Sequence, residues 1–312
     1  MRKVILHVTD KQGLNLAEHS VAVALLTQSI SQYVIFCVDF EPPFENLLVS
    51  SAQQIGKSVE YRPLATPQEF DELYRSKGAH SHVTSAASLK MNALLSLQGE
   101  FDRALYIDND VLLMKDFGLD QINFGEAPIA AVYDIAKVGG IGSDADFQKR
   151  CKASGLSPHY FNSGVIAARL TALTSTHVEL YQNALKHHST CGYADDCSCD
   201  DQCAWNVAFA TQWKRLPLTL NFQACAMFSD GWANAIARHY VGPQKFLPIR
   251  AWRNDRKDTT LIANARVLLG LSATQKQILD IVRRLNALRN LKMQKSANDA
   301  IAAINKMYEF IY

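Results

Sequence analysis

Two patterns of apolar positions alternate along the 312-residue chain. Short apolar runs rich in β-branched and aromatic residues are typical of buried strands, and they predict strands at 4–8, 33–38, 59–64, 103–107, 129–133 and 164–168. Apolar residues spaced three or four apart predict helices at 14–31, 44–54, 67–75, 85–97, 173–187 and 202–211. Because strands and helices alternate, we expect an α/β layered fold with a mostly parallel sheet.

The sequence changes character after residue 250. Residues 251–312 carry a net charge of +6, whereas residues 1–250 carry a net charge of −4. The stretch 252–260 is charged and polar. We therefore expect it to link a main domain at 1–250 to a helical tail that begins near Leu261, within a basic extension at 251–312.

This extension contains an apolar stripe at helical spacing, with basic residues lying away from it. The stripe consists of Ile278, Ile281, Val282, Leu285 and Leu288, and the basic residues are Lys276, Arg283 and Arg284. A basic amphipathic helix can lie on an anionic membrane surface. The pattern predicts either a peripheral membrane contact of this kind or a helix that packs on the main domain.

Composition excludes several classes of protein. With 48% hydrophobic and 20% charged residues, the chain suits a folded globular protein rather than a disordered or coiled-coil one. The net negative charge of residues 1–250 argues against nucleic-acid binding. No stretch reaches the roughly 18 uncharged apolar residues of a membrane-spanning helix. The apolar run after Lys3 is too short for a secretory signal, so we expect a cytoplasmic protein.

Four of the seven cysteines cluster, at Cys191, Cys197, Cys199 and Cys203. Their spacing lacks the paired C-x2-C knuckles that are usual in structural zinc sites. The spacing therefore favours independent thiols or a local disulfide over a zinc or cluster site.

Two carboxylates follow the strand predicted at 103–107, in the sequence Asp108-Asn109-Asp110. Where the chain turns after the strand, both side chains can face one bound cation. Hard divalent ions such as Mg²⁺ and Mn²⁺ prefer oxygen ligands and often complete their shell with substrate phosphates. The motif predicts a metal site here; the alternative is a pair of acidic residues in a surface turn.

Three further motifs carry polar residues that suit such a site. His239 supplies an imidazole ligand, Gly242 allows the backbone to approach a phosphate closely, and Lys245 provides a charge for a diphosphate. Small polar residues in Phe161-Asn162-Ser163-Gly164 adjoin a predicted strand. Asp200-Asp201-Gln202 lies at a predicted helix start, where an Asp can instead serve as an N-cap.

In chain order, these four motifs resemble those of the family 8 glycosyltransferases, the group with glycogenin and the bacterial lipooligosaccharide galactosyltransferases. The order is D-x-D, F-N-S-G, D-Q and H-x-x-G-x-x-K, over roughly residues 1–250. The resemblance implies a GT-A (Rossmann-like) catalytic domain at 1–250 that uses Mn²⁺ or Mg²⁺. It also implies transfer of a hexose, with retention, from a nucleotide sugar such as UDP-glucose or UDP-galactose to a glycan, lipid-linked or protein acceptor.

The resemblance also implies roles for individual residues. The implied metal ligands are Asp108, Asp110 and His239. The residues implied to bind the nucleotide sugar are Thr9, Asp10, Lys90, Asn109, Asn162, Ser163, Gly242 and Lys245. The residues implied to act on the sugar side, as the catalytic set, are Asp134, Asp201 and Gln202.

Three short segments depart from the family pattern, and none of the changed residues is an implied metal ligand. The family's Asn-Tyr pair, whose ring packs on uracil, corresponds to about Gln12-Gly13. The family's D-Q-D is Asp201-Gln202-Cys203 here, and its K-P-W is Lys245-Phe246-Leu247. These departures leave the base, the donor sugar and the acceptor open.

Two other functions remain as alternatives. Phosphatases of the haloacid-dehalogenase type also use D-x-D, but they place it at the first strand, with Thr or Val four residues after the first Asp. Leu112 holds that position here, about a hundred residues into the chain. The second alternative is a sugar-nucleotide binding protein that has lost catalysis.

Overall fold

The computed structural model describes most of the chain. It covers residues 1–43, 46–68, 85–141, 147, 149, 157–188, 200–242, 245–247, 256–271 and 287–309. Most of the helix predicted at 67–75 lies outside these residues, as do Cys191, Cys197 and Cys199.

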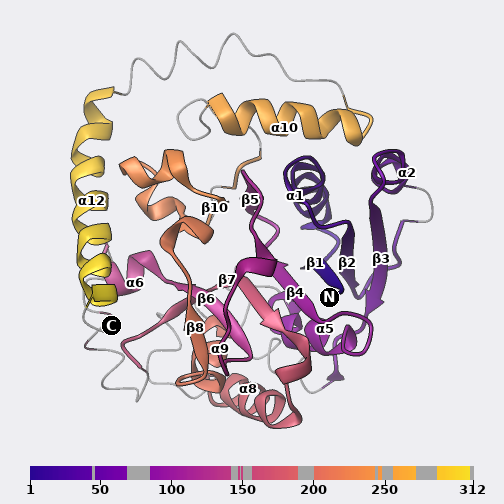
Figure 1. The fold of residues 1–312 in the computed structure, drawn as a ribbon, viewed down its shortest axis with the longest axis horizontal. Coiled ribbons are helices and arrows are strands. Elements are labelled where there is room, and N and C mark those ends of the chain that lie inside the picture. The colour runs from indigo at the N-terminus through magenta and orange to yellow at the C-terminus, as the bar shows by residue number, and fades with distance from the viewer. Residues whose placement is uncertain are drawn as a thin grey trace.

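A seven-stranded sheet forms the centre of the molecule (Figure 1). Its strands, in the spatial order β3-β2-β1-β4-β7-β6-β8, are β3 (Ser58–Leu64), β2 (Gln32–Val38), β1 (Lys3–Thr9), β4 (Arg103–Ile107), β7 (Phe161–Arg169), β6 (Ile129–Tyr133) and β8 (Trp213–Arg215). All neighbouring pairs are parallel except those of β7, which runs antiparallel to β4 and β6. The expectation of an α/β fold with a mostly parallel sheet is confirmed.

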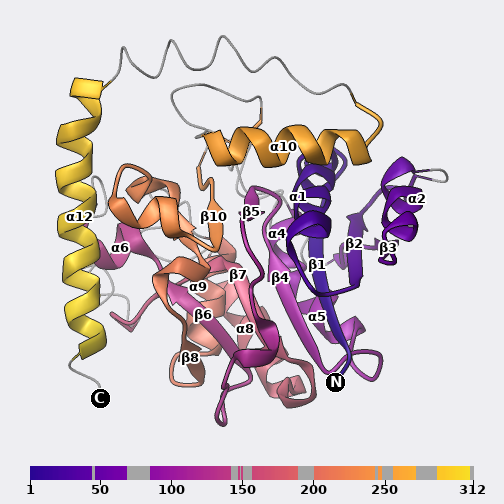
Figure 2. The same cartoon turned by 45° about the horizontal axis from the view of Figure 1, so that its top comes forward.

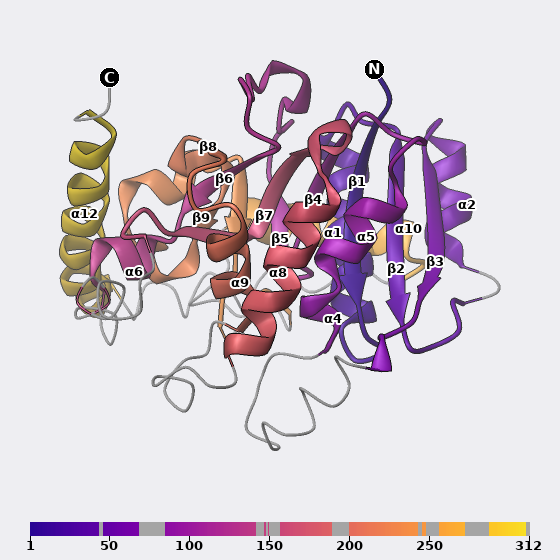
Figure 3. The same cartoon turned by 90° about the horizontal axis from the view of Figure 1, so that it is seen from below.

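Helices cover both faces of this sheet (Figure 3). On one face, alternate strand residues such as Ile5 and Ile35 share a core with α1 (Leu14–Thr27) and α2 (Leu47–Gln54). On the other, residues such as Val4 and Leu6 share a core with α4, α5, α8 and α9. These four helices are Ser85–Ser88, Lys90–Ser96, Ser175–His188 and Asp200–Ala208. The continuous apolar strands are therefore explained by burial on both sides.

A second, three-stranded sheet lies beside the first and was not predicted. Its order is β5 (Val111–Leu113), β10 (Ala237–His239) and β9 (Phe222–Gln223). Strand β10 runs antiparallel to β5, with His239 opposite Val111, and parallel to β9. This sheet brings the segment after the D-x-D motif against a strand more than a hundred residues later in the chain.

Several predicted boundaries are corrected by the structure. The helix expected at 85–97 is two helices, α4 and α5, separated at the buried Leu89. The strand expected at 164–168 begins earlier, at Phe161, so that the small polar motif lies within β7. Short helical turns, not predicted, lie at α6 (Ile135–Gly139), η1 (Leu119–Gln121), η3 (Leu170–Ala172), η4 (Leu218–Leu220), η5 (Ala224–Ala226) and η6 (Asp230–Asn234).

The C-terminal segment packs on the rest of the molecule (Figures 1 and 2). Helix α10 (Arg256–Leu268) contacts α1 and α2. It begins inside the stretch 252–260 that we expected to be a linker, and Asp258 in that stretch is fully buried. Helix α12 (Ala287–Glu309) packs on α6 and η5 and buries Ala297, Ala300 and Ile304. The segment thus has a packing role over its described residues.

The expected membrane contact gains no support from these residues. The residues of the apolar stripe before Leu288, and the Leu288 side chain, lie outside the described part of the chain. Within the described residues, no helix combines the length and the apolar character that crossing a membrane requires.

Candidate active site

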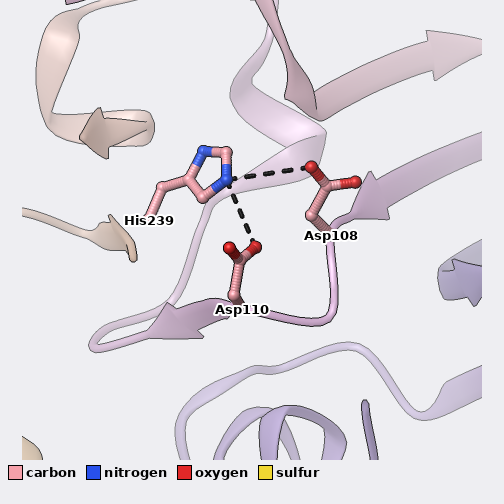
Figure 4. Close-up of side chains that lie close together, drawn as sticks. All are labelled: Asp108, Asp110 and His239. Carbon is pink, nitrogen blue, oxygen red and sulfur yellow. Dashed lines mark ion pairs between the residues drawn. The ribbon is translucent and has the colours of Figure 1, made fainter. Parts of the chain in front are cut away.

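Asp108, Asp110 and His239 converge between the two sheets (Figure 4). Asp108 follows the last residue of β4, and its backbone N–H donates to the Gly164 carbonyl at 2.8 Å. His239 ends β10 and places Nε2 3.3 Å from Asp110 Oδ1 and 3.7 Å from Asp108 Oδ2. One potential ligand atom from each residue lies within 4.8 Å of the others. The two motifs therefore meet as the metal-site prediction required.

The surroundings fit a divalent cation at this point. Two carboxylates and one imidazole are ligand types that bind divalent cations. Gly164 leaves room for them, since a Cβ at this position would lie 2.2 Å from His239 Cε1 and 2.7 Å from Asp108 Oδ2. Glycine in the F-N-S-G motif is thus required by the close approach of Asp108 and His239.

Two lysines pair with the D-x-D carboxylates. Lys90 is almost fully buried and places Nζ 3.0 Å from Asp108 Oδ1 and 2.8 Å from Asp201 Oδ2. Burial alone would lower the pKa of Lys90, but the charges of Asp108 and Asp201 outweigh it and raise the pKa. Lys245 places Nζ 2.6 Å from Asp110 Oδ2. Positive charge therefore lies on both sides of the candidate metal position.

The pKa values of the buried Asp110 and Asp201 shift in opposite directions. Burial would raise the pKa of Asp110, but His239 and Lys245 outweigh burial and lower that pKa. For Asp201, burial is the larger effect and raises the pKa despite the opposing charge of Lys90. Asp110 is thus held as a carboxylate at neutral pH by its two partners.

Residues expected on the sugar side form one buried hydrogen-bonded network. Gln202 Nε2 donates to Asp134 Oδ2 at 2.9 Å, and Asn162 Nδ2 donates to Gln202 Oε1 at 3.0 Å. Ser163 Oγ donates to Asp201 Oδ2 at 3.1 Å, on the oxygen that also faces Lys90. Asp134 is also the N-cap of α6, where it accepts from the Lys137 backbone N–H.

Residues expected to bind the nucleotide lie at the ends of β1 and β4. Asn109 Nδ2 donates to Thr9 Oγ1 at 2.9 Å, and the Gly13 backbone N–H donates to Asp10 Oδ1 at 2.7 Å. A Cβ at position 13 would lie 2.6 Å from Thr9 Oγ1 and 2.8 Å from Asn109 Nδ2. Gly13 therefore permits this close cluster, in place of the family's larger residue.

Gly242 lies three residues after His239 and has a φ of 92°, in the region that favours glycine. Among the described residues, no atom lies within 4 Å of the place where a Cβ at this position would stand. The predicted residues thus lie in three adjoining groups: Thr9, Asp10 and Asn109; Asp108, Asp110, His239, Lys90, Lys245 and Gly242; Asp134, Asn162, Ser163, Asp201 and Gln202.

Two residues of the site were missed by the motif analysis. Tyr106 donates its hydroxyl to Asp108 Oδ1 at 2.5 Å, and its ring lies 5.0 Å from Lys90 Nζ. Asn221 Oδ1 lies 3.1 Å from His239 Nδ1. Tyr106 is two residues before Asp108 in a buried strand, so its polar hydroxyl was a signal that a partner was needed. Asn221 had no such signal.

Residues 14–248 match the family model described as Glycosyl transferase family 8. The chain belongs to glycosyltransferase family 8. This membership confirms the expected enzyme class and excludes the haloacid-dehalogenase alternative for the matched domain. No match was found among curated proteins.

Solved structures show the same fold for this family 8 glycosyltransferase at low sequence identity. The galactosyltransferase LgtC, in complex with donor and acceptor sugar analogs, is 16% identical with a TM-score of 0.61, covering 89% of this chain and 99% of LgtC. The bifunctional glycosyltransferase WbbM is 17% identical with a TM-score of 0.59, covering 88% of this chain and 52% of WbbM. GlyE of Streptococcus pneumoniae TIGR4 is 16% identical with a TM-score of 0.55, covering 86% of this chain and 62% of GlyE. These similarities confirm the GT-A fold.

Proposed function

We propose that the enzyme transfers a hexose from a nucleotide-diphosphate sugar, UDP-glucose or UDP-galactose, to a hydroxyl of a glycan, lipid-linked or protein acceptor. The proposal includes dependence on Mn²⁺ or Mg²⁺ and retention at the anomeric carbon. The observation that carries it is the convergence of Asp108, Asp110 and His239 next to Lys90 and Lys245. A diphosphate leaving group needs this arrangement of cationic charge around it.

The proposed roles on the diphosphate side follow from chemistry and distance. Asp108, Asp110 and His239 hold the cation, which when bound neutralises charge developing on the diphosphate. Lys245 pairs with Asp110 and its side chain is partly exposed to solvent, so its ammonium can turn to a phosphate oxygen without crossing a packed core. Lys90, which the family resemblance places at the diphosphate, is buried between two carboxylates, and in this position it also orients Asp108 and Asp201.

The proposed roles on the sugar side rest on the buried network. Asp201 and Asp134 accept hydrogen bonds from sugar hydroxyls and so orient the ring. Gln202 is held by Asp134, Asn162 and the Ser163 backbone N–H, the last at 3.2 Å from its Oε1. Its amide oxygen carries no full charge, so it stabilises a positive anomeric carbon as a fixed dipole rather than forming a lasting covalent bond.

The proposed nucleotide site lies beside the metal ligands. Asn109 stands between Asp108 and Asp110 and is fixed to Thr9, which orients it toward the end of β1. Asp10 is held by the Gly13 backbone N–H through one oxygen. We assign the ribose to Asn109 and the base to Asp10 and Thr9.

A panel of nucleotide sugars tests the donor assignment. Purified protein is incubated with Mn²⁺ and UDP-, GDP-, ADP- and dTDP-sugars, and release of the nucleoside diphosphate is measured without an acceptor. We expect turnover of UDP-glucose or UDP-galactose that stops in excess chelator and resumes when Mn²⁺ is restored. Binding of these donors without any turnover would instead support the binding-protein alternative and contradict the proposed reaction.

A further inference from the structure

A buried line of side-chain hydrogen bonds joins the sugar side of the site to the metal ligand His239. Asn162 Nδ2 donates to Asp134 Oδ2 at 3.3 Å, and Asn221 Nδ2 donates to Asn162 Oδ1 at 2.9 Å. At the end of the line, Asn221 Oδ1 faces His239 Nδ1 at 3.1 Å. Asn221 is completely buried, and Asn162 and His239 are nearly so. The family motifs include Asn162 and His239 but not Asn221.

One backbone donor, the Gly164 N–H, fixes the direction of the bonds in the line. The Gly164 N–H donates to Asn162 Oδ1 at 3.0 Å, so the Nδ2 of Asn162 must face the opposite way, toward the carboxylate of Asp134. Asn221 then has to present its Nδ2 to Asn162 Oδ1. Turning the Asn221 amide over would set two carbonyl oxygens against each other. The oxygen of Asn221 is therefore the atom that faces His239.

An oxygen at this position determines which imidazole nitrogen is available for a cation. Asn221 Oδ1 can only accept, so His239 Nδ1 carries the proton and donates it. The other nitrogen, Nε2, is the one that faces Asp108 and Asp110. Hydrogen bonds of this kind orient metal-binding histidines and fix their tautomer.

We propose that Asn221 is a positioning residue that holds His239 with Nε2 directed at the bound divalent cation. The proposal rests on the metal site of the proposed function and adds a residue to it. It also links that site to the sugar side, because Asn162 orients Asn221 and is itself held by Asp134 and Gln202. Since Asn221 has no solvent exposure, bulk water does not replace its oxygen in the native protein.

Mn²⁺ titration of the metal-free protein, followed by the electron paramagnetic resonance signal of free Mn²⁺, tests the proposal. Asn221→Leu removes the oxygen at similar size and should weaken Mn²⁺ binding by about 10- to 100-fold. Asn221→Asp keeps an acceptor oxygen toward His239 but sets its second oxygen against Asn162 Oδ1, so it should bind Mn²⁺ more tightly than Asn221→Leu. Gln28→Leu is the control, because Gln28 is a buried amide bonded to Lys115 and Phe117 and should leave Mn²⁺ binding unchanged.

Nitrogen hyperfine coupling to Mn²⁺, measured on protein with ¹⁵N-labelled histidine, reports the ligand itself. We expect the coupling in wild type and Asn221→Asp and its loss or weakening in Asn221→Leu. Asn221→Ala removes the same oxygen without adding bulk and replaces the Leu variant if that variant does not fold. Wild-type affinity and coupling in a folded Leu or Ala variant would overturn the proposal alone. Absence of Mn²⁺ binding by wild type would overturn the proposed function as well.

Discussion

Asp201 is held by two groups that act on the same oxygen. Lys90 Nζ and Ser163 Oγ both contact Oδ2, at 2.8 and 3.1 Å. The other oxygen, Oδ1, has no hydrogen bond or ion pair with a described residue. An N-cap role alone, which the sequence left open, does not require a buried lysine partner. These contacts support a carboxylate that is oriented for a ligand.

Asp201→Asn tests the sugar-side assignment. The amide retains the shape but loses the charge that orients donor hydroxyls as the transition state forms. We expect kcat to fall roughly 10²-fold or more, equivalent to about 2.7 kcal/mol, with nucleotide binding nearly unchanged. Asp230→Asn, in η6, serves as a control and should leave kcat at the wild-type value. A kcat for Asp201→Asn within a few-fold of wild type would show that the side chain has only a structural role.

At the residue scale, sequence reasoning could find the ligands but not their supports. Asp108, Asp110 and His239 have side chains whose chemistry suggests a cation, and two short motifs contain them. Asn221 lies between a short helical turn and a two-residue strand, where a polar residue is ordinary. Its importance arises from contacts with Asn162 and His239, which are 59 and 18 residues away in the chain. Such contacts exist only once the fold has formed.

Strand β10 and helix α10 are joined by a buried charged cluster. Arg238 Nη1 lies 2.7 Å from Asp258 Oδ1, and the Tyr240 hydroxyl donates to Asp258 Oδ2 at 2.5 Å. Arg238 and Tyr240 are the neighbours of His239 on either side. Asp258 in the C-terminal segment therefore fixes the strand that carries a candidate metal ligand, and the segment after residue 250 contributes to the stability of the site.

Asp258→Ala tests this link between the two elements. The substitution removes the carboxylate that pairs with the buried Arg238, and breaking a buried ion pair in this way typically costs about 3–5 kcal/mol of unfolding free energy. We also expect weaker Mn²⁺ binding, because β10 loses its support next to His239. Urea denaturation and Mn²⁺ titration measure the two effects. Glu100→Ala breaks the exposed pair with Arg62 and should cost less than about 1 kcal/mol; equal costs for both variants would contradict the account.

The same cluster explains why helix α10 begins within 252–260, the stretch that we expected to be a linker. The run of charged residues there is typical of a solvated connection. Asp258 is nevertheless fully buried, because Arg238 of strand β10 compensates its charge.

The short strands of the second sheet were not predicted for a related reason. β5, β9 and β10 contain two or three residues each, too few for an apolar pattern, and they exist through pairing with one another.

At the scale of the whole molecule, the main sheet was predictable because five of its strands, β1, β2, β4, β6 and β7, are apolar runs buried on both faces. Six of its seven strands coincide with predicted runs, and only the short β8 was absent from the prediction. The order of the strands and the antiparallel direction of β7 were not predictable from local pattern, since they depend on long-range pairing. The family motifs added what periodicity lacked, namely that four separate segments share one site.

The most direct measurement of the central claim compares Mn²⁺-dependent release of nucleoside diphosphate from UDP-glucose or UDP-galactose by wild type and Asp110→Asn. Asp110 is buried between His239 and Lys245, so the variant loses a metal ligand and the charge that both partners face. Asp120→Asn is the matched control, because it makes the same substitution at an exposed aspartate. We predict turnover by wild type and the control, none by folded Asp110→Asn, and none by wild type in excess chelator. Full turnover by Asp110→Asn, or by wild type in chelator, would contradict a catalytic metal at Asp108, Asp110 and His239.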